Sequence, residues 1–306
     1  MSTWRARGRV LRAVRGIAVA AVLPGVMTAT AAPALAWVAP FADSQPAVAP
    51  SSPPISVFGG ELVNASTGAS LWAQGLGISR PMGSITKVMT ALVVLQAGGL
   101  NRKIEVTKAA VRYVSRDGAS SAGLIPGDML TVRQLLAAML IPSGCDAAYL
   151  LATAYGPGRP AFIAKMNATA AELGMTSTHF TSFDGMPYPT EHSTYSTPAD
   201  LITLGLAAMK YPVFQSIVAM RKYRLRATTS HHAYLWQQTN VLIGSYPGAL
   251  GVKTGDTKAA GNCLLFEATR RGVTLIGVVL HASPTSNPGS AIVAARRLLN
   301  WAFARM

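Results

Sequence analysis

The sequence lacks several features that would point directly to a function. It has only 12 acidic side chains against 27 lysines and arginines, yet the basic residues are scattered and form no basic run. A nucleic-acid-binding tail would concentrate them, so we expect no nucleic-acid partner. The five histidines have no partners at metal-ligand spacing, and we expect His231 and His232, in a polar stretch, to be solvated. We therefore expect no metal site at these histidines.

Long hydrophobic runs and internal repeats are also missing. The apolar stretch 16–27 is too short for a comfortable membrane span. It follows five arginines and precedes an Ala-Leu-Ala cleavage motif, so residues 1–36 have the pattern of a secretory signal peptide, with an uncleaved anchor as the alternative. We expect an exported protein, either in the periplasm or cell wall or secreted. The predicted last helix, 288–304, contains two arginines, and we expect no C-terminal membrane anchor.

Charge and length set further limits. Loss of residues 1–36 with their five arginines lowers the formal charge from +15 to +10. This charge suits an anionic cell-envelope surface, or it reflects only a basic solvated surface. Residues 37–54 are rich in proline, alanine and serine and are predicted to form a linker. Residues 55–306 are long enough for one large domain with a sizeable core.

Apolar periodicity and turn residues predict the elements of this domain. We expect strands at 57–64, 69–74, 262–269 and 273–280, and helices at 88–95, 132–140, 159–173, 198–209 and 288–304, with one more starting at 147. The segments 104–121 and 176–194 show no clear pattern, and no element is predicted there.

Ser84 and Lys87 stand at the start of a predicted buried helix that ends at Gly98. Positions i and i+3 share a helix face, so the hydroxyl and the amine can point into the same space. A serine becomes a nucleophile when a base takes its proton, and a lysine in a dry site near another cation can be that base. Because serine is also an ordinary helix cap, the pair alone remains a hypothesis.

Two further motifs follow in order. Ser143-Gly-Cys145 lies in the turn between two predicted helices, and Lys253-Thr-Gly255 lies on the strand before the final strand pair. Together with Ser84-x-x-Lys they match the order of the S-x-x-K, S-x-N and K-T-G motifs of penicillin-recognising serine enzymes. From about residue 55 to its end the chain resembles the D-alanyl-D-alanine carboxypeptidases among the low-molecular-mass penicillin-binding proteins. Segments around 126–136, 166–167, 173–175, 178–180 and 246–248 share this resemblance.

The resemblance implies a fold and an activity. The fold is α/β in the α+β sense, of the β-lactamase and transpeptidase type: a mostly antiparallel sheet flanked by helices, with an inserted all-helical subdomain. Residues 55–306 would form this penicillin-binding serine peptidase domain. The activity implied is a serine-type D-Ala-D-Ala carboxypeptidase that acts on peptidoglycan stem peptides through an acyl-enzyme and is inhibited covalently by β-lactams. We expect a monomer.

The resemblance also implies the catalytic residues Ser84, Lys87 and Ser143. Ser84 attacks the carbonyl of the terminal peptide bond, and Lys87 takes its proton. Ser143 relays a proton to the departing D-alanine. Water then releases the acyl group, and no metal or cofactor is required.

The substrate-binding residues that the resemblance implies are Cys145, Lys253, Thr254, Gly255 and Asp256. Lys253 supplies positive charge that keeps Lys87 neutral and attracts the free carboxylate of the substrate, and Thr254 hydrogen-bonds that carboxylate. The backbone N–H groups of Ser84 and Asp256 form the oxyanion hole.

Two positions depart from the family pattern. Cys145 replaces the usual asparagine, and a thiol is a weak hydrogen-bond donor and acceptor. Asp256 replaces an aromatic residue or histidine, and its carboxylate should point away from the oxyanion hole or pair with Lys258. These departures keep open a DD-transpeptidase and a catalytically weak muropeptide-binding protein. A class A β-lactamase is disfavoured, because Glu172 lacks that family's E-x-x-N pattern.

The two cysteines are the remaining question. Exported proteins ordinarily pair two cysteines, so a bond between Cys145 and Cys263 is one possibility. The resemblance places them on opposite walls of a groove, whereas a disulfide needs Cα atoms within about 7 Å. We predict two free thiols, with Cys145 reachable from the groove and Cys263 buried.

Overall fold

A computed structural model describes residues 52, 53, 55–282 and 289–306, apart from the side chains of residues 116 and 117. The predicted signal peptide and nearly all of the predicted linker lie outside the described residues. The chain divides into residues 1–49 and 50–306, and every described residue belongs to the second unit.

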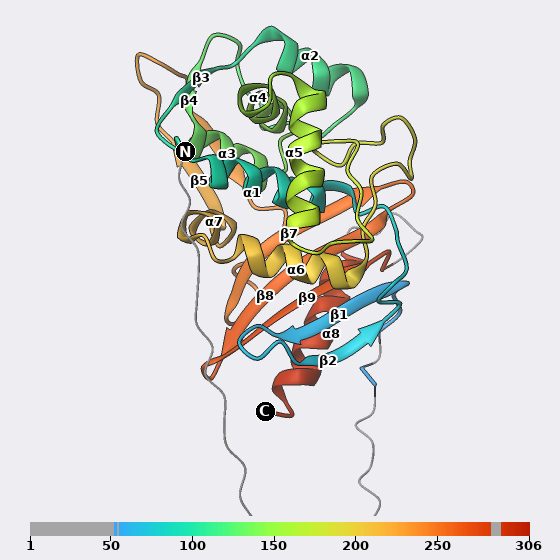
Figure 1. Cartoon of the computed structure of the whole chain (residues 1–306). Coiled ribbons are helices and arrows are strands. Elements are labelled where there is room, and N and C mark those ends of the chain that lie inside the picture. Colours follow the sequence, from blue (N-terminus) through green and yellow to red (C-terminus); the bar gives the residue numbers. More distant parts are fainter. Residues whose placement is uncertain (1–51, 54, 283–288) are drawn as a thin grey trace, which may run out of the picture. The chain divides into compact units, whose positions relative to one another are not determined.

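The centre of this unit is a five-stranded antiparallel sheet with the strand order β2-β1-β9-β8-β7 (Figure 1). Its strands are β1 (Gly59–Asn64), β2 (Ser70–Gln74), β7 (Ala249–Thr257), β8 (Gly261–Arg270) and β9 (Val273–Leu280). Strands from both ends of the chain therefore pair directly, since β1 lies beside β9. β7 is an edge strand, so one row of its backbone groups faces outward beside the helical layer.

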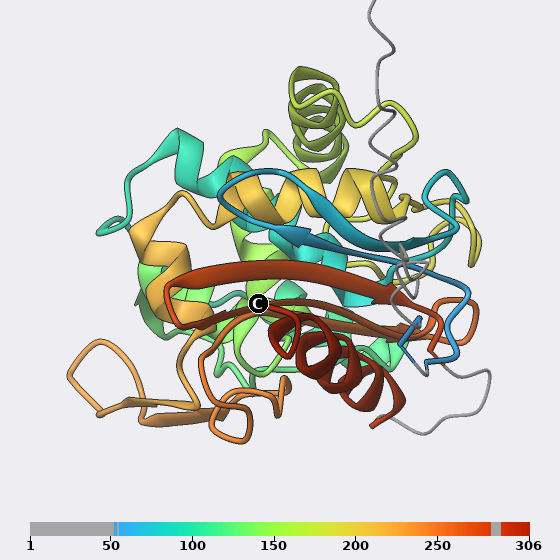
Figure 2. The same ribbon diagram turned by 90° about the horizontal axis from the view of Figure 1, so that it is seen from below.

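The two faces of the sheet carry two separate apolar cores. Along β8, Leu264 and Phe266 pack with helix α8 (Ser290–Phe303) on one face, while Leu265 packs under helix α6 (Pro198–Ala208) on the other. This alternation follows from the two-residue period of a strand. Figure 2 shows the sheet edge-on between α8 and α6.

The remaining helices form a layer above α6 in Figure 1. They are the short 3₁₀ helix η1 (Gly83–Thr86), α1 (Lys87–Ala97), α2 (Lys108–Asp117), α3 (Val132–Leu140), α4 (Cys145–Tyr155), α5 (Arg159–Glu172) and α7 (Pro212–Val218). The α3 start is a capping box in which Thr131 and Gln134 bond each other's backbone N–H groups. Within the described ranges no single helix is long and apolar enough to cross a membrane; α6 and α7 pass that test only together, with a 110° bend between them.

Most predicted elements are confirmed, and the exceptions lie where the pattern is polar. The segment 104–121 contains α2, capped by Thr107 and ended by Gly118 in the left-handed conformation. The subdomain is not wholly helical, because two ribbons accompany the helices: β3 (Lys103–Glu105) with β4 (Met129–Thr131), and β5 (Lys222–Leu225) with β6 (Tyr234–Gln237). The ribbon strands are short, and tertiary contacts rather than periodicity define them, whereas α2 is amphipathic and its periodicity was missed.

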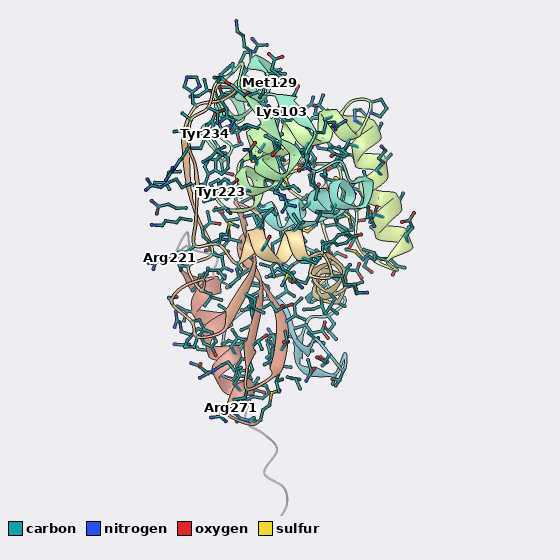
Figure 3. All side chains as sticks on the ribbon, turned by 90° about the vertical axis from the view of Figure 1, so that its left-hand side faces the viewer. Lys103, Met129, Arg221, Tyr223, Tyr234 and Arg271 are labelled. Atoms are coloured by element: carbon teal, nitrogen blue, oxygen red, sulfur yellow. The ribbon has the colours of Figure 1, made fainter. Side chains whose placement is uncertain are left out.

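The prediction that His231 and His232 are solvated is wrong for His231 but right for His232, whose side chain is 63% exposed. The His231 side chain is buried, and the His232 ring lies 2.8 Å from a carboxylate oxygen of the buried Asp128. Burial alone would raise the pKa of Asp128, but hydrogen bonds from Tyr234 and His232 outweigh it and lower the pKa. This cluster ties the segment after β5 to the turn before β4, on the side of the molecule where Figure 3 labels Tyr234 and Met129.

Candidate active site

Ser84 and Lys87 meet at the junction of η1 and α1. The Lys87 Nζ donates to Ser84 Oγ at 2.7 Å and to the Asp184 carbonyl oxygen at 2.9 Å. The Lys87 side chain is fully buried, whereas Ser84 is partly open to solvent. The predicted i and i+3 juxtaposition is therefore present, with the amine on the dry side of the hydroxyl.

Asp184 holds Lys87 in place, although sequence analysis did not single it out. Its carbonyl receives the lysine, and its buried carboxylate accepts from Tyr113 Oη at 2.9 Å and Ser182 Oγ at 2.7 Å. Its neighbour Gly185 has φ +87°, and an added Cβ would stand 2.0 Å from the Gly83 carbonyl oxygen. The loop can approach the Ser84 turn this closely only with glycine at that position.

Ser143 comes from the turn between α3 and α4. It has φ +68°, an uncommon conformation for a residue with a side chain, and it is largely buried. Ser120 holds the turn from outside, because its Oγ donates to the Ser143 carbonyl oxygen at 2.6 Å and its own carbonyl accepts from Cys145 N–H at 2.8 Å. A strained residue kept in place by surrounding bonds is typical of functional sites.

Asp146 anchors the same turn from the protein interior. Its fully buried carboxylate accepts from Ser121 Oγ at 2.7 Å, from the N–H groups of Ala122 and Ala147 at 3.0 and 2.9 Å, and from Leu124 N–H at 3.3 Å. It lies in the first turn of α4, where the helix dipole also favours a negative charge. This residue too was missed from the sequence, where it reads as an ordinary helix-start acid.

Strand β7 supplies the opposite wall. Lys253 is fully buried, and its Nζ donates to the Thr254 carbonyl oxygen at 3.0 Å. Burial and the neighbouring charge of Lys87 lower the pKa of Lys253 well below its usual value. The two lysines therefore interact, and the pKa that this interaction lowers is that of Lys253. Thr254 Oγ1 hydrogen-bonds Thr239 Oγ1 at 2.8 Å, which adds Thr239 to the site.

The backbones of η1 and β7 touch at Gly255. A Cβ on Gly255 would stand 2.2 Å from the Met82 carbonyl oxygen and 3.1 Å from the Ser84 nitrogen. A Cβ on Gly83 would likewise stand 2.7 Å from the Asp256 nitrogen. The N–H groups of Ser84 and Asp256 therefore belong to neighbouring backbone segments.

Members of all three motifs line one cleft of about 500 Å³, with Lys87 and Lys253 buried behind its surface. Its walls include Ser84, Ser120, Ser143, Met186, Thr239, Thr254, Gly255, Asp256, Asn262 and Cys263. The three motifs, far apart in sequence, thus meet in one place. Within the described residues no group of three or more His, Cys, Asp or Glu side chains could hold a metal ion.

The prediction for the cysteines is half right. Both are free thiols, as expected. Cys145, however, is not reachable from the cleft: it is 1% exposed, and its Sγ lies 3.6 Å from Ser120 Oγ at the buried start of α4. Cys263 is buried as predicted, at 2% exposed, although it borders the cleft. Burial raises the pKa of Cys145 to about 11 and that of Cys263 to about 12.

Of the two arrangements expected for Asp256, the ion pair with Lys258 is not present among the residues that the structure describes. The Asp256 side chain is exposed and the residue lines the cleft, while its backbone nitrogen lies beside the Ser84 turn.

A serine whose Oγ meets a buried lysine, a second serine on a strained turn and a lysine on an edge strand define a class: serine enzymes that use lysine, without a histidine, for acyl transfer. Comparison with known proteins gives the family. The chain belongs to the D-alanyl-D-alanine carboxypeptidase family, whose model matches residues 48–284.

Individual relatives agree with this assignment. The chain is 42% identical over 271 residues to a D-alanyl-D-alanine carboxypeptidase from a Streptomyces species, covering 85% of this chain and 91% of the relative. A D-alanyl-D-alanine carboxypeptidase from Mycobacterium tuberculosis is 35% identical over 243 residues, covering 78% and 79%.

Solved structures confirm the fold class. The Streptomyces DD-transpeptidase superposes with a TM-score of 0.77 at 41% identity, over 82% of this chain and 98% of that one. A D-alanyl-D-alanine carboxypeptidase from Mycobacterium tuberculosis superposes with a TM-score of 0.76 at 33% identity, over 86% and 96%.

Proposed function

We propose that this protein is a serine-type D-Ala-D-Ala carboxypeptidase that acts on peptidoglycan stem peptides. The observation that carries the proposal is the 2.7 Å hydrogen bond between Lys87 Nζ and Ser84 Oγ inside the cleft. The names of the relatives support the reaction. β-Lactams would acylate the same serine covalently.

The first half of the reaction forms the acyl-enzyme. Unprotonated Lys87 takes the proton of Ser84, whose oxygen attacks the carbonyl of the terminal D-Ala-D-Ala bond. The N–H groups of Ser84 and Asp256 donate to the oxyanion, because the backbone segments that carry them lie side by side at Gly83 and Gly255. Ser143 relays to the leaving amine the proton that Lys87 took from Ser84, the bond to D-alanine breaks, and an ester remains on Ser84.

The substrate is held along β7. As an edge strand, β7 offers backbone groups with which an extended peptide can pair. The terminal carboxylate of the substrate binds the positive charge of Lys253 and the hydroxyls of Thr254 and Thr239. The two hydroxyl oxygens lie 2.8 Å apart. Gly255 allows the peptide and the Ser84 turn to share this space.

Transpeptidation is the second candidate. It is favoured by the likeness to the Streptomyces DD-transpeptidase and by Cys145, which is buried at the position of the motif's usual asparagine. The thiol has no strong donor to offer a substrate amide, so positioning depends on β7. In this variant an amine rather than water attacks the ester on Ser84.

One experiment separates these readings. Release of D-alanine from a pentapeptide, measured with and without an added amine acceptor, gives the hydrolysis and transfer rates. Hydrolysis without the acceptor supports the carboxypeptidase, and release that requires the acceptor supports the transpeptidase. Absence of both reactions in a folded protein contradicts enzymatic activity and favours the third alternative, a muropeptide-binding protein.

We also propose that the protein works outside the cytoplasm as a monomer and that its β5–β6 face contacts an anionic envelope surface. Lys222, Arg224 and Arg226 are exposed and form no ion pair within the described ranges. Figure 3 labels Arg221, Lys103 and Tyr223 on this side. Binding to anionic vesicles that weakens with salt, and that a Lys222→Glu, Arg224→Glu variant loses, supports this contact; equal binding to neutral vesicles contradicts it.

A further inference from the structure

Glu267 is an acid where the fold calls for an apolar side chain. It lies on β8 two residues after Leu265, and therefore on the same sheet face as that core residue. Its side chain is 6% exposed. Within the described residues no protein group hydrogen-bonds or forms an ion pair with its carboxylate, and the carboxylate oxygens are not among the fully buried unpaired atoms, so they are accessible from the space beside them. A largely buried carboxylate without a partner from the protein is unfavourable, and such groups usually receive a partner.

The carboxylate borders a cavity of about 800 Å³ that is separate from the catalytic cleft. Its walls come from the end of α6, from α7, from the start of β7, from β9 and from the turn after β1: Ala65, Ser66, Leu206, Met209, Lys210, Pro212, Gln215, Ser216, Ala219, Leu250 and Thr274. The cavity shares no lining residue with the cleft around Ser84. Glu267 pairs with Gly251, four residues before Gly255, so the two sites are separated by about 13 Å along β7.

The lining defines the chemistry of a ligand. Leu206, Met209, Pro212 and Leu250 offer apolar surface around a single buried acceptor. Lys210 is the one cation in the lining, and its side chain is exposed. Burial raises the pKa of Glu267 to about 7, and no charge of Lys210 opposes this rise. The lysine therefore lies at the rim rather than against the carboxylate.

We propose that this cavity is a second binding site, for an aliphatic amine whose ammonium group pairs with Glu267 and whose far end carries an anionic group toward Lys210. A hydrogen-bonded ammonium group supplies the partner that the carboxylate lacks. The apolar walls bury the carbon chain between the two charges. The ligand class is thus an ω-amino acid or a peptide side chain of the same form.

The test uses 6-aminohexanoate and hexanoate as probes on the full chain, followed by backbone amide chemical shifts. 6-Aminohexanoate at millimolar concentration should shift the amides of Leu250 and Thr274 and leave those of Ser143 and Thr254 unchanged. Hexanoate, which lacks the amine, should bind about tenfold more weakly or not at all.

Two variants complete the test. Glu267→Gln should weaken 6-aminohexanoate binding by at least about tenfold. Glu61→Gln should leave it unchanged, because Glu61 is a largely buried acid of the same sheet that does not line the cavity. Equal binding of both probes, unaltered binding by Glu267→Gln, or absence of shifts at Leu250 and Thr274 would overturn the proposal. None of these readouts depends on acylation of Ser84, so they stand apart from the proposed function.

Discussion

Asp146 is the residue whose removal should most clearly separate positioning from chemistry. Its buried carboxylate accepts from four donors, Ser121 Oγ and the N–H groups of Ala122, Leu124 and Ala147. All three backbone donors belong to buried residues. Asp146→Ala leaves them without an acceptor in a place that water reaches poorly.

The size of the effect follows from those donors. Each unsatisfied buried N–H is unfavourable by about 1–3 kcal/mol, and relaxation of the turn recovers part of this, so we expect a loss of about 3–5 kcal/mol in the free energy of unfolding. Asp146→Asn keeps one acceptor oxygen and should lose about 2 kcal/mol. Ser121→Ala removes one donor and serves as the matched control, with a loss near 1 kcal/mol. Urea denaturation with a constant slope gives all three values.

Catalysis should change in parallel with this series. Asp146 holds the segment that carries Ser120, and Ser120 holds the strained Ser143 turn. The folded Asp146→Asn protein should therefore be acylated by penicillin about tenfold more slowly, because small displacements of a catalytic group have large effects. If Asp146→Ala loses less than about 1 kcal/mol, the account of the turn is refuted.

Three further predictions concern titratable groups. Burial and the charge of Lys87 lower the pKa of Lys253, so the positive charge that Lys253 offers to a substrate carboxylate should be lost as pH rises; Lys253→Ala should slow acylation and remove this pH dependence, and a variant that keeps the pH profile of the unmodified protein would contradict the role of Lys253. Burial raises the pKa of Glu267 from 4.5 to about 7, so its stabilising effect is fully present below pH 4.5 and is lost as pH rises to 7, by about 3 kcal/mol in total. The free energy of unfolding of Glu267→Gln should lack this slope, and an unchanged slope would contradict the assigned environment. Thiol reagents should find no reactive cysteine in the native protein and two in denaturant; none in denaturant would reveal a disulfide.

Local sequence signals predicted the parts of the site that neighbouring residues determine. The spacing of Ser84 and Lys87 is enough to place their side chains together once a helix begins there. The cap at Thr131 and the strands around Arg271 were predictable for the same reason. The family resemblance then supplied the order of the three motifs, and with it the two walls of the cleft.

The partners that come from distant segments were not predictable. Asp184 meets Lys87 across 97 positions, and Thr239 reaches Thr254 only because the segment after β6 returns beside β7. Cys145 was expected to face the groove, but its place in the first turn of a buried helix directs the thiol inward. Glu267 gives no sequence signal at all, since one acid in a strand is ordinary until its surroundings are known.

The central prediction for the site is that Ser84 is the nucleophile, and a single measurement tests it. The roles of the other site residues are also predictions: Lys87, Ser143, Cys145, Lys253, Thr254, Gly255 and Asp256. The full chain is incubated with benzylpenicillin, and the intact mass and the peptide that carries the adduct are determined. We predict one penicilloyl group per chain, attached to Ser84, and none on a folded Ser84→Ala variant. An adduct on another residue, or undiminished labelling of Ser84→Ala, would contradict the assignment of Ser84 as the nucleophile.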